Sequence, residues 1–197
     1  MIPHFKPETS ALLLIDYQVG TMQLAKTTPG DEALRNAVIL AKAAKVLGIP
    51  IILTSSQEDR VQGLTDERFK RIAPEAYEKR IKRSGVIDAW HDPNFRLAVE
   101  ETGRRQLIMA AITTDICLVF PAISAVEAGY EVQAVMDASS SPYQINEDIS
   151  RHRLDRAGVL MTVTTTMTAE LIGDWGSPAG QEIVKFLPVP ALMQPID

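Results

Sequence analysis

The 197-residue chain contains a single cysteine, which excludes an intrachain disulfide. A lone thiol fits a reducing compartment. The first ten residues lack the basic stretch followed by an apolar stretch that marks a secretory signal. No apolar run approaches the ~18 residues that a membrane span requires. We therefore expect a cytoplasmic protein with no membrane partner.

The chain also lacks an excess of positive charge. Its formal net charge is -5 and its basic residues form no stripe, which argues against a nucleic-acid partner. Apolar residues make up 46% of the chain and charged residues 23%, as in ordinary globular domains. We predict one domain over residues 1–197, with its core at about 9–175 and a C-terminal helix and tail at 176–197.

Short apolar runs alternate with segments of helical periodicity along the chain. The predicted strands are residues 11–15, 49–54, 77–81, 106–112, 130–136 and 159–163. The predicted helices are residues 31–47, 92–102, 115–129, 147–157, 168–175 and 178–186, and residues 55–68 are expected to form a loop. Repeated strand–helix units predict a parallel sheet with helices on both faces. We expect a three-layer α/β/α doubly wound fold of six strands in the order 3-2-1-4-5-6.

Two residues with chemical potential follow strands that are neighbours in this order. Asp16 ends the first strand, and Cys117 lies just after the fourth. The crevice of a doubly wound sheet opens at the carboxyl ends of such strands, so these side chains should meet there. A thiol at a strand-to-helix turn is favoured as a thiolate, and a nearby carboxylate can take up its proton. The alternatives are a buried structural cysteine and an aspartate that only caps a turn.

A cationic cluster lies at the end of the third predicted strand, namely Lys79, Arg80, Lys82 and Arg83. A solvated surface is the ordinary role for most residues of such a run. A cation at the end of this strand would reach the same crevice. It would hold a thiolate–carboxylate pair together and lower the pKa of the thiol.

Three segments together resemble the isochorismatase-like cysteine hydrolases. They are residues 12–18 (LLLIDYQ), the pair 82–83 with residues 87–90 (IDAW), and residues 111–117 (AITTDIC). Residues 87–90, 120–129 (FPAISAVEAG) and 136–139 (MDAS) are most similar to the YcaC-like subgroup of that family. The resemblance implies a doubly wound fold carrying an Asp–Lys–Cys triad that hydrolyses amides or, in the founding enzyme, a vinyl ether.

The resemblance also implies roles for individual residues. Cys117 corresponds to the nucleophile and Asp16 to the general base. The cation corresponds to Arg83, with the adjacent Lys82 as the alternative. Because an arginine does not release a proton near neutral pH, the role of Arg83 would be electrostatic only.

The resemblance further implies how the substrate is held. A cis peptide bond between Ile112 and Thr113 would direct the Thr113 N–H, together with that of Cys117, at an oxyanion. Gln18, Trp90 and the loop at residues 55–68 are expected to shape the substrate pocket.

Histidine is scarce where a metal site would need it. The metal-binding branch of the resembled family uses an Asp-x-His pattern and a further histidine after the second strand, but residues 55–61 contain no histidine. We therefore predict no metal and no cofactor. His4, His91 and His152 are scattered and are expected to be exposed.

The function that these observations favour is a cysteine hydrolase that cleaves a small amide or related C–N bond of a small-molecule substrate through a thioester on Cys117. A catalytically degenerate binding or scaffold protein on the same fold is the alternative. A nucleotide-binding domain is disfavoured, since no glycine-rich phosphate loop follows the first strand.

Apolar side chains beyond those of the core suggest self-association. The helix with Leu118, Val119, Phe120, Ile123 and Val126 is apolar on more than one face, and the tail at residues 187–193 is strongly apolar. Such a tail packs either on its own domain or on a neighbour. We predict a homo-oligomer, and the YcaC-like resemblance implies a large ring-like assembly such as an octamer.

Overall fold

Six parallel strands form a single sheet in the computed structural model, which describes residues 4–188. The strands are β1 (Ser10–Ile15), β2 (Ile51–Ser56), β3 (Ile81–Arg83), β4 (Gln106–Ala111), β5 (Glu131–Val135) and β6 (Leu160–Thr162). Their order is β3-β2-β1-β4-β5-β6, and every neighbouring pair is parallel. The predicted sheet topology is confirmed.

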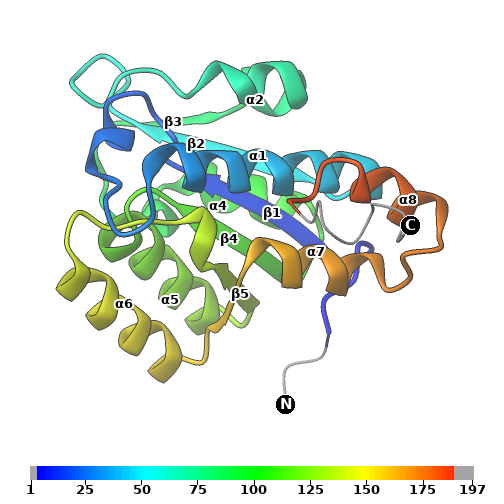
Figure 1. Ribbon diagram of the computed structural model, residues 1–197. Helices are drawn as coiled ribbons and strands as arrows, with labels where there is room; N and C mark the ends of the chain where they lie inside the picture. The colour runs from blue at the N-terminus through cyan, green and yellow to red at the C-terminus, as the bar shows by residue number, and fades with distance from the viewer. Residues whose placement is uncertain (1–3, 189–197) are drawn as a thin grey trace.

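Helices cover both faces of the sheet, which gives the three predicted layers. They are α1 (Gly30–Leu47), α2 (Glu67–Ile72), α3 (Pro74–Glu78), α4 (Pro93–Glu101), α5 (Val119–Glu127), α6 (Gln144–Arg156), α7 (Thr164–Ile172) and α8 (Pro178–Val184). Figure 1 shows α1, α7 and α8 on one side of β1, and α4, α5 and α6 on the other. Within residues 4–188 no helix is both long and apolar enough to cross a membrane.

Strand β1 lies at the centre of the sheet and is buried along its whole length. Because side chains alternate across a strand, Leu12 and Leu14 pack in the core beneath α1 and α7. Leu13 and Ile15 pack in the opposite core, beneath α4 and α5. Burial on both faces explains why this strand is a continuous apolar run.

The third strand lies later in the chain than predicted. Residues 74–78 form α3, which begins at Pro74, and β3 starts only at Ile81. A proline at the first helical position already has the φ that a helix needs, so this segment turns into a helix. Tyr77, predicted to begin the strand, is buried and donates a hydrogen bond from its hydroxyl to the Thr65 carbonyl at 3.2 Å. The shift makes Arg83 the last residue of β3.

The other predicted elements are present and differ only at their ends, whereas α2 (Glu67–Ile72) was not predicted. α6 and α7 start three to four residues earlier than predicted, and a short turn precedes α5. α8 packs on α1 through Ile183, which contacts Ile39 and Ala43 in a small apolar cluster. Leu187 joins this cluster, whereas residues 189–193 of the predicted apolar tail lie outside the described residues.

Candidate active site

The site begins where β1 ends, at Asp16. This residue has a φ of 60°, in the left-handed region that residues with side chains rarely adopt. Its N–H donates to the Thr54 carbonyl of β2 at 2.9 Å. Non-glycine residues with this backbone conformation cluster at functional sites. The turn leaves the Asp16 carboxylate buried at the carboxyl edge of the sheet.

Arg83 holds this carboxylate from the end of β3. Its Nη2 lies 2.5 Å from both oxygens of Asp16. Its Nε donates to the Thr54 hydroxyl at 3.0 Å and its Nη1 to the Val86 carbonyl at 2.7 Å, so each of its three nitrogens is engaged. Lys82, the alternative cation, is exposed and lies 3.5 Å from Glu58 instead. The structure therefore places Arg83, and not Lys82, against Asp16.

Cys117 lies in a turn of π-helix, Thr114–Leu118 (η3), between β4 and α5. The Leu118 N–H donates to the Thr113 carbonyl at 3.1 Å, five residues back. Single π turns of this kind often occur at functional sites. The thiol is half-buried and faces the Asp16 carboxylate. The two residues that the strand order was expected to bring together are thus neighbours.

The pKa of the Cys117 thiol is raised well above its ordinary value, and the expectation of a lowered value is wrong. Burial is the largest cause, followed by the negative charge of Asp16 and the hydrogen bond between thiol and carboxylate. The Thr113 N–H and the charge of Arg83 act in the opposite direction and are outweighed. Arg83 is already paired with Asp16, so the thiol experiences the carboxylate more strongly than the cation.

The peptide bond between Ile112 and Thr113 is cis. The Thr113 N–H lies near the sulfur of Cys117, where it acts to lower the pKa of the thiol. The next residue is tied to the neighbouring chain segment, since the Thr114 N–H donates to the Ser140 carbonyl at 2.9 Å. The backbone before the thiol is therefore held against both the sulfur and the loop that follows β5.

A cavity of about 430 Å³ opens beside these groups. Asp16, Arg83, Thr113 and Cys117 lie in its wall. Other lining side chains come from three separate segments: Thr21 and Leu24, then Gln57, Val61 and Gln62, then Val86 and Ile87. Parallel strands alone bring Asp16 and Cys117 together, but the cavity depends on the loops around them.

Gln18 lines the cavity, as predicted, but its amide is already hydrogen-bonded. The Nε2 donates to the carbonyls of Ser56 and Gly63, at 2.9 and 2.5 Å, and the Oε1 accepts from the Ser56 N–H at 2.8 Å. Gln18 therefore ties β1 to the loop after β2, and this loop forms one wall of the cavity.

Trp90 does not line this cavity, so the prediction that it shapes the pocket is corrected. Its side chain is buried in the core. There it makes edge-to-face contacts with Phe95 and Tyr130, at ring-centroid distances of 6.3 and 5.2 Å. From the same four-residue segment Ile87, which is 63% exposed, is the residue that reaches the cavity.

Several residues of the site were not predicted from the sequence. Thr54, which holds Arg83, has a recognisable signal, since it is a polar residue near the carboxyl end of a buried strand beside β1. Gln62 belongs to the loop at residues 55–68, which was expected to shape the pocket and does line the cavity. Thr21 has no such signal, because it reaches the cavity only through the folding of the loop after β1.

A second arginine–carboxylate pair lies at the same edge of the sheet. Arg80 Nε and Nη2 contact the two oxygens of Glu58 at 2.6 and 3.0 Å, and the Ser55 hydroxyl donates to Glu58 at 2.8 Å. Although burial raises the pKa of Glu58, the hydrogen bonds from Arg80 and Ser55 outweigh it and leave this pKa lowered. The pair is largely buried.

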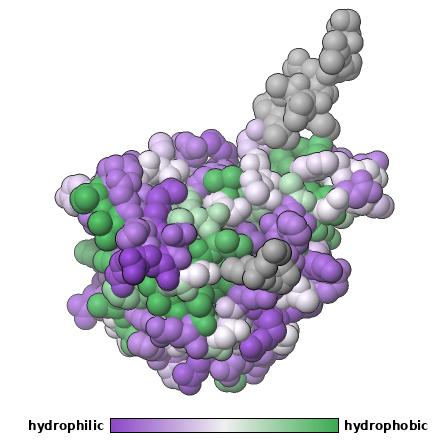
Figure 2. Space-filling model, turned by 90° about the horizontal axis from the view of Figure 1, so that it is seen from below, coloured by the Kyte–Doolittle hydropathy of each residue, from purple (hydrophilic) through white to green (hydrophobic). Residues whose placement is uncertain are grey.

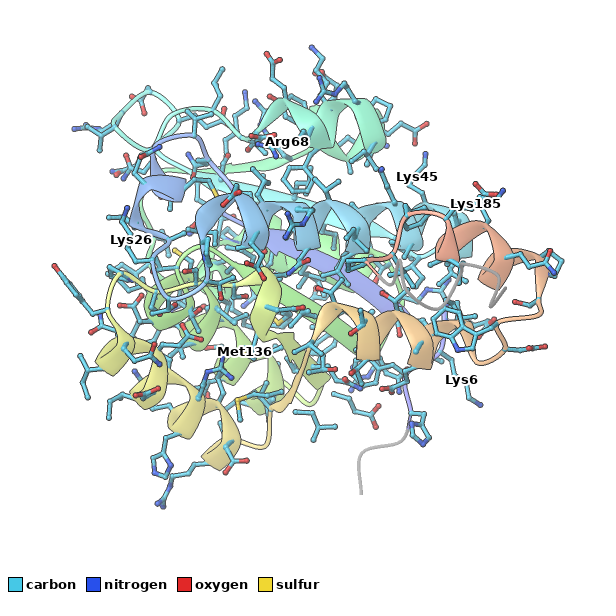
Figure 3. The ribbon with its side chains drawn as sticks, in the orientation of Figure 1. Lys6, Lys26, Lys45, Arg68, Met136 and Lys185 are labelled. Atoms are coloured by element: carbon cyan, nitrogen blue, oxygen red, sulfur yellow. The ribbon has the colours of Figure 1, made fainter. Side chains whose placement is uncertain are left out.

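No group of three histidine, cysteine, aspartate or glutamate side chains in the described part of the chain is close enough to hold a metal ion. His4, His91 and His152 are exposed, as predicted. In Figure 3 the side chains of Lys6, Lys26, Lys45 and Lys185 lie at the periphery of the molecule, whereas Met136 is buried in its interior.

Comparison with known proteins identifies the family. The isochorismatase domain model matches residues 10–167, and the chain belongs to the isochorismatase family. A relative named probable hydrolase YcaC, from Escherichia coli strain K12, is 36% identical over 166 residues, which are 84% of this chain and 79% of that protein. Isochorismatase domain-containing protein 2 from Rattus norvegicus is 25% identical over 94% of this chain and 85% of its own length.

Two solved structures share the fold over nearly the whole chain. YcaC from Pseudomonas aeruginosa, solved with hexane-2,5-diol and covalent acrylamide, has a TM-score of 0.89 at 32% identity and covers 94% of this chain and 92% of its own. YcaC from Escherichia coli, described as an octameric hydrolase of unknown specificity, has a TM-score of 0.88 at 33% identity with the same coverage. The predicted resemblance to the YcaC-like group is confirmed.

Proposed function

We propose that this member of the isochorismatase family is a hydrolase that cleaves a small amide or related C–N bond through a thioester on Cys117. The observation that carries the proposal is the buried Asp16–Arg83 pair facing the only cysteine of the chain in the wall of a cavity. The YcaC relative from Escherichia coli is named a probable hydrolase. The Pseudomonas aeruginosa relative was solved with covalent acrylamide, an electrophile of the kind that adds to thiols.

The raised pKa of Cys117 determines how the nucleophile is activated. At neutral pH the resting thiol keeps its proton, so the attacking thiolate must form during the reaction. Asp16 is hydrogen-bonded to that thiol and is the group that accepts the proton. Arg83 fixes the carboxylate in place and offsets its charge, and it does not itself transfer a proton.

Cys117 is first acylated by the substrate and then released by water. The thiol proton passes to Asp16 while the sulfur bonds to the carbonyl carbon, and the carbonyl electron pair moves to oxygen. When the tetrahedral intermediate collapses, the C–N bond breaks and the nitrogen takes the proton from Asp16, which releases ammonia or an amine. Asp16 then accepts a proton from water as the water oxygen attacks the thioester. The C–S bond breaks, and the sulfur recovers the proton from Asp16.

The negative charge on the carbonyl oxygen needs donors close to the sulfur. The N–H groups of Thr113 and Cys117 are the candidates, since the Thr113 N–H already lies against the sulfur in the resting site. Backbone donors held in place before the reaction are an efficient way to stabilise such an oxyanion, because they do not reorganise during the step.

The proposal is tested by ammonia release from a panel of small amides, with the wild type compared with Cys117→Ser. We expect turnover of at least one amide by the wild type, an acyl adduct on Cys117 in quenched mass spectra, and neither in the variant. Cys117→Ala serves as a second variant, and circular dichroism checks that both fold. Full activity in either folded variant would exclude a thioester on Cys117. A wild type that neither turns over nor binds covalently would favour the alternative of a degenerate binding protein.

We also propose that the chain forms a homo-oligomer. The octameric Escherichia coli relative supports this, as does the exposed apolar surface. Leu118 and Val119, expected to contribute, are fully buried in the chain's own core. Exposed apolar side chains lie instead on α6, where Ile145 is 66% exposed, and Figure 2 shows hydrophobic patches among hydrophilic residues on one face of the molecule. Light scattering should give a mass several times 21.7 kDa, and a monomeric mass contradicts the proposal.

A further inference from the structure

Charge is nearly absent from the wall of the catalytic cavity. Apart from Asp16 and Arg83, every residue that lines it within the described range 4–188 is uncharged. These two side chains pair with each other, and the other two nitrogens of Arg83 donate to Thr54 and Val86. An anionic substrate group would therefore meet no unpaired cation there and would have to displace a buried ion pair. Displacing one partner of such a pair is costly.

Two polar atoms in the residues that line this cavity lack any partner. The Thr21 hydroxyl belongs to a side chain that is 9% exposed, and neither it nor the Gln62 Oε1 has a hydrogen bond in the structure. Buried polar atoms are nearly always hydrogen-bonded. Both atoms have almost no accessible surface, so a substrate would pair with them after the Thr21 and Gln62 side chains rotate toward the cavity.

The orientation of the Gln62 amide follows from its neighbours. Gln57 Nε2 is 3.4 Å from the Ser84 carbonyl and can only donate to it. This leaves Gln57 Oε1 to accept from Gln62 Nε2 at 3.0 Å. The free atom of Gln62 is therefore its oxygen, which is an acceptor. A substrate that satisfies it must carry a donor, such as the N–H of an amide.

The loop that carries Gln62 is held in place before any ligand binds. The Gly20 N–H donates to the Gln62 carbonyl at 2.8 Å, and the Val19 N–H donates to the Leu64 carbonyl at 3.0 Å. The loop lies so close to Gly20 that a Cβ there would clash with the Val61 carbonyl oxygen. Recognition by Gln62 thus requires no closure of this loop.

The mouth of the cavity is apolar. Leu24, Val61, Ile87 and Ile116 all line the cavity and expose between 44% and 89% of their surface. Each comes from a different segment of the chain. Side chains of this kind bind hydrocarbon and offer nothing to a charged group.

We propose that the substrate is an uncharged carboxamide bearing a small aliphatic group. The amide N–H donates to Gln62 Oε1, the Thr21 hydroxyl makes the second polar contact, and the aliphatic group packs on the apolar mouth. This inference rests on the proposed cysteine mechanism and adds the class of substrate. Gln62 and Thr21 are specificity residues that touch the substrate.

Iodoacetamide and iodoacetate test the charge preference, since they alkylate thiols by the same chemistry. Iodoacetamide carries an uncharged amide, whereas iodoacetate carries a negatively charged carboxylate. Rates of Cys117 modification are followed by mass spectrometry, and each is divided by the rate for free cysteine under the same conditions. We expect the ratio of the iodoacetamide rate to the iodoacetate rate to be at least about 10-fold larger for Cys117 than for free cysteine. Equal preference would overturn the inference.

Variants test the two polar contacts. Thr21→Val and Gln62→Leu should each slow the iodoacetamide reaction by about 2- to 10-fold, as expected for one lost hydrogen bond, with little effect on the iodoacetate reaction. Thr21→Ser should restore the rate. A cation at the mouth, Ile87→Lys, should raise the iodoacetate rate selectively, whereas Leu97→Lys, exposed on α4 and outside the cavity, should not.

The same experiment separates this inference from the mechanism on which it rests. If carboxamides are turned over and Cys117 is acylated, but Thr21→Val and Gln62→Leu alter neither reagent's rate, the recognition proposal is wrong and the mechanism stands. If no amide is turned over and Cys117 forms no acyl adduct, the mechanism fails first. Thermal unfolding of each variant identifies any that lose the fold, and Gln62→Met replaces Gln62→Leu in that case.

Discussion

Two buried arginine–carboxylate pairs lie at the carboxyl edge of the sheet, and only one of them faces a thiol. Arg83 and Arg80 are three residues apart, and each holds both oxygens of its carboxylate, Asp16 and Glu58 respectively. Both pairs are largely buried, but Arg80 uses two nitrogens for its carboxylate and Arg83 uses one. The neighbours also differ, because the Asp16 carboxylate faces Cys117 and raises its pKa. A buried ion pair by itself therefore does not indicate a reactive site. The thiol beside the Asp16–Arg83 pair is what distinguishes it from the other pair.

The largest difference between the pairs should appear in amide turnover when the charge of one carboxylate is removed. Asp16→Asn should reduce amide turnover by about 10²- to 10⁴-fold, since the variant loses the proposed general base. The same change removes two of the causes that raise the pKa of Cys117, so the pH profile of its alkylation should move to lower pH. Lower turnover together with an unshifted alkylation profile would mean that Asp16 has only a structural role.

Glu58→Gln is the matched change in the other pair. It removes charge-assisted hydrogen bonds from Arg80, so the free energy of unfolding should fall by about 1–3 kcal/mol, measured by denaturant titration. Turnover at a temperature where the variant is folded should stay within about twofold of the wild type. A loss of turnover as large as that of Asp16→Asn would show that the two pairs act together.

Trp90→Phe should affect stability and leave binding unchanged. The indole is buried against Phe95 and Tyr130, and a smaller ring leaves part of that space empty. We expect the free energy of unfolding to fall by about 1–3 kcal/mol. The KM for an amide substrate should not change, because Trp90 does not line the cavity. A several-fold rise in KM would show that Trp90 does shape the substrate pocket.

The smallest effect concerns pH. The pKa of Cys117 is raised in the folded state, so the unfolded chain, with an ordinary pKa of about 8.5, loses this proton first as pH rises. The contribution of this thiol to the free energy of unfolding is therefore fully present below pH ~8.5. It falls above that pH, by about 1 kcal/mol between pH 8.5 and 9.5. Urea titrations should show this loss in the wild type and not in Cys117→Ser. An equal loss in both would assign it to another group.

Much of the site could be predicted because it follows from strand order. Asp16 and Cys117 follow strands that are neighbours in a parallel sheet, and parallel strands place their carboxyl ends at one edge. Arg83 was predicted through its position beside a recognisable motif. Residues 74–78 form a helix, so β3 starts later than predicted. This later start makes Arg83 the last residue of β3, where it contacts Asp16.

The remaining features depend on distances that no pattern encodes. Ile87 and Trp90 belong to one motif, yet one is in the cavity wall and the other in the core. The direction of the Cys117 pKa shift depends on how deeply the thiol is buried and on which of two opposite charges is closer and less compensated.

The sequence by itself determined the family, the order of the strands and the residues that meet at the crevice, because hydrophobic periodicity and motif spacing are local properties of the chain. Only the tertiary structure decided that the thiol rests protonated, that Arg83 rather than Lys82 holds Asp16, and that Thr21 and Gln62 reach the cavity. Burial, charge balance and loop packing arise from groups far apart in the chain. They become defined only when the chain has folded.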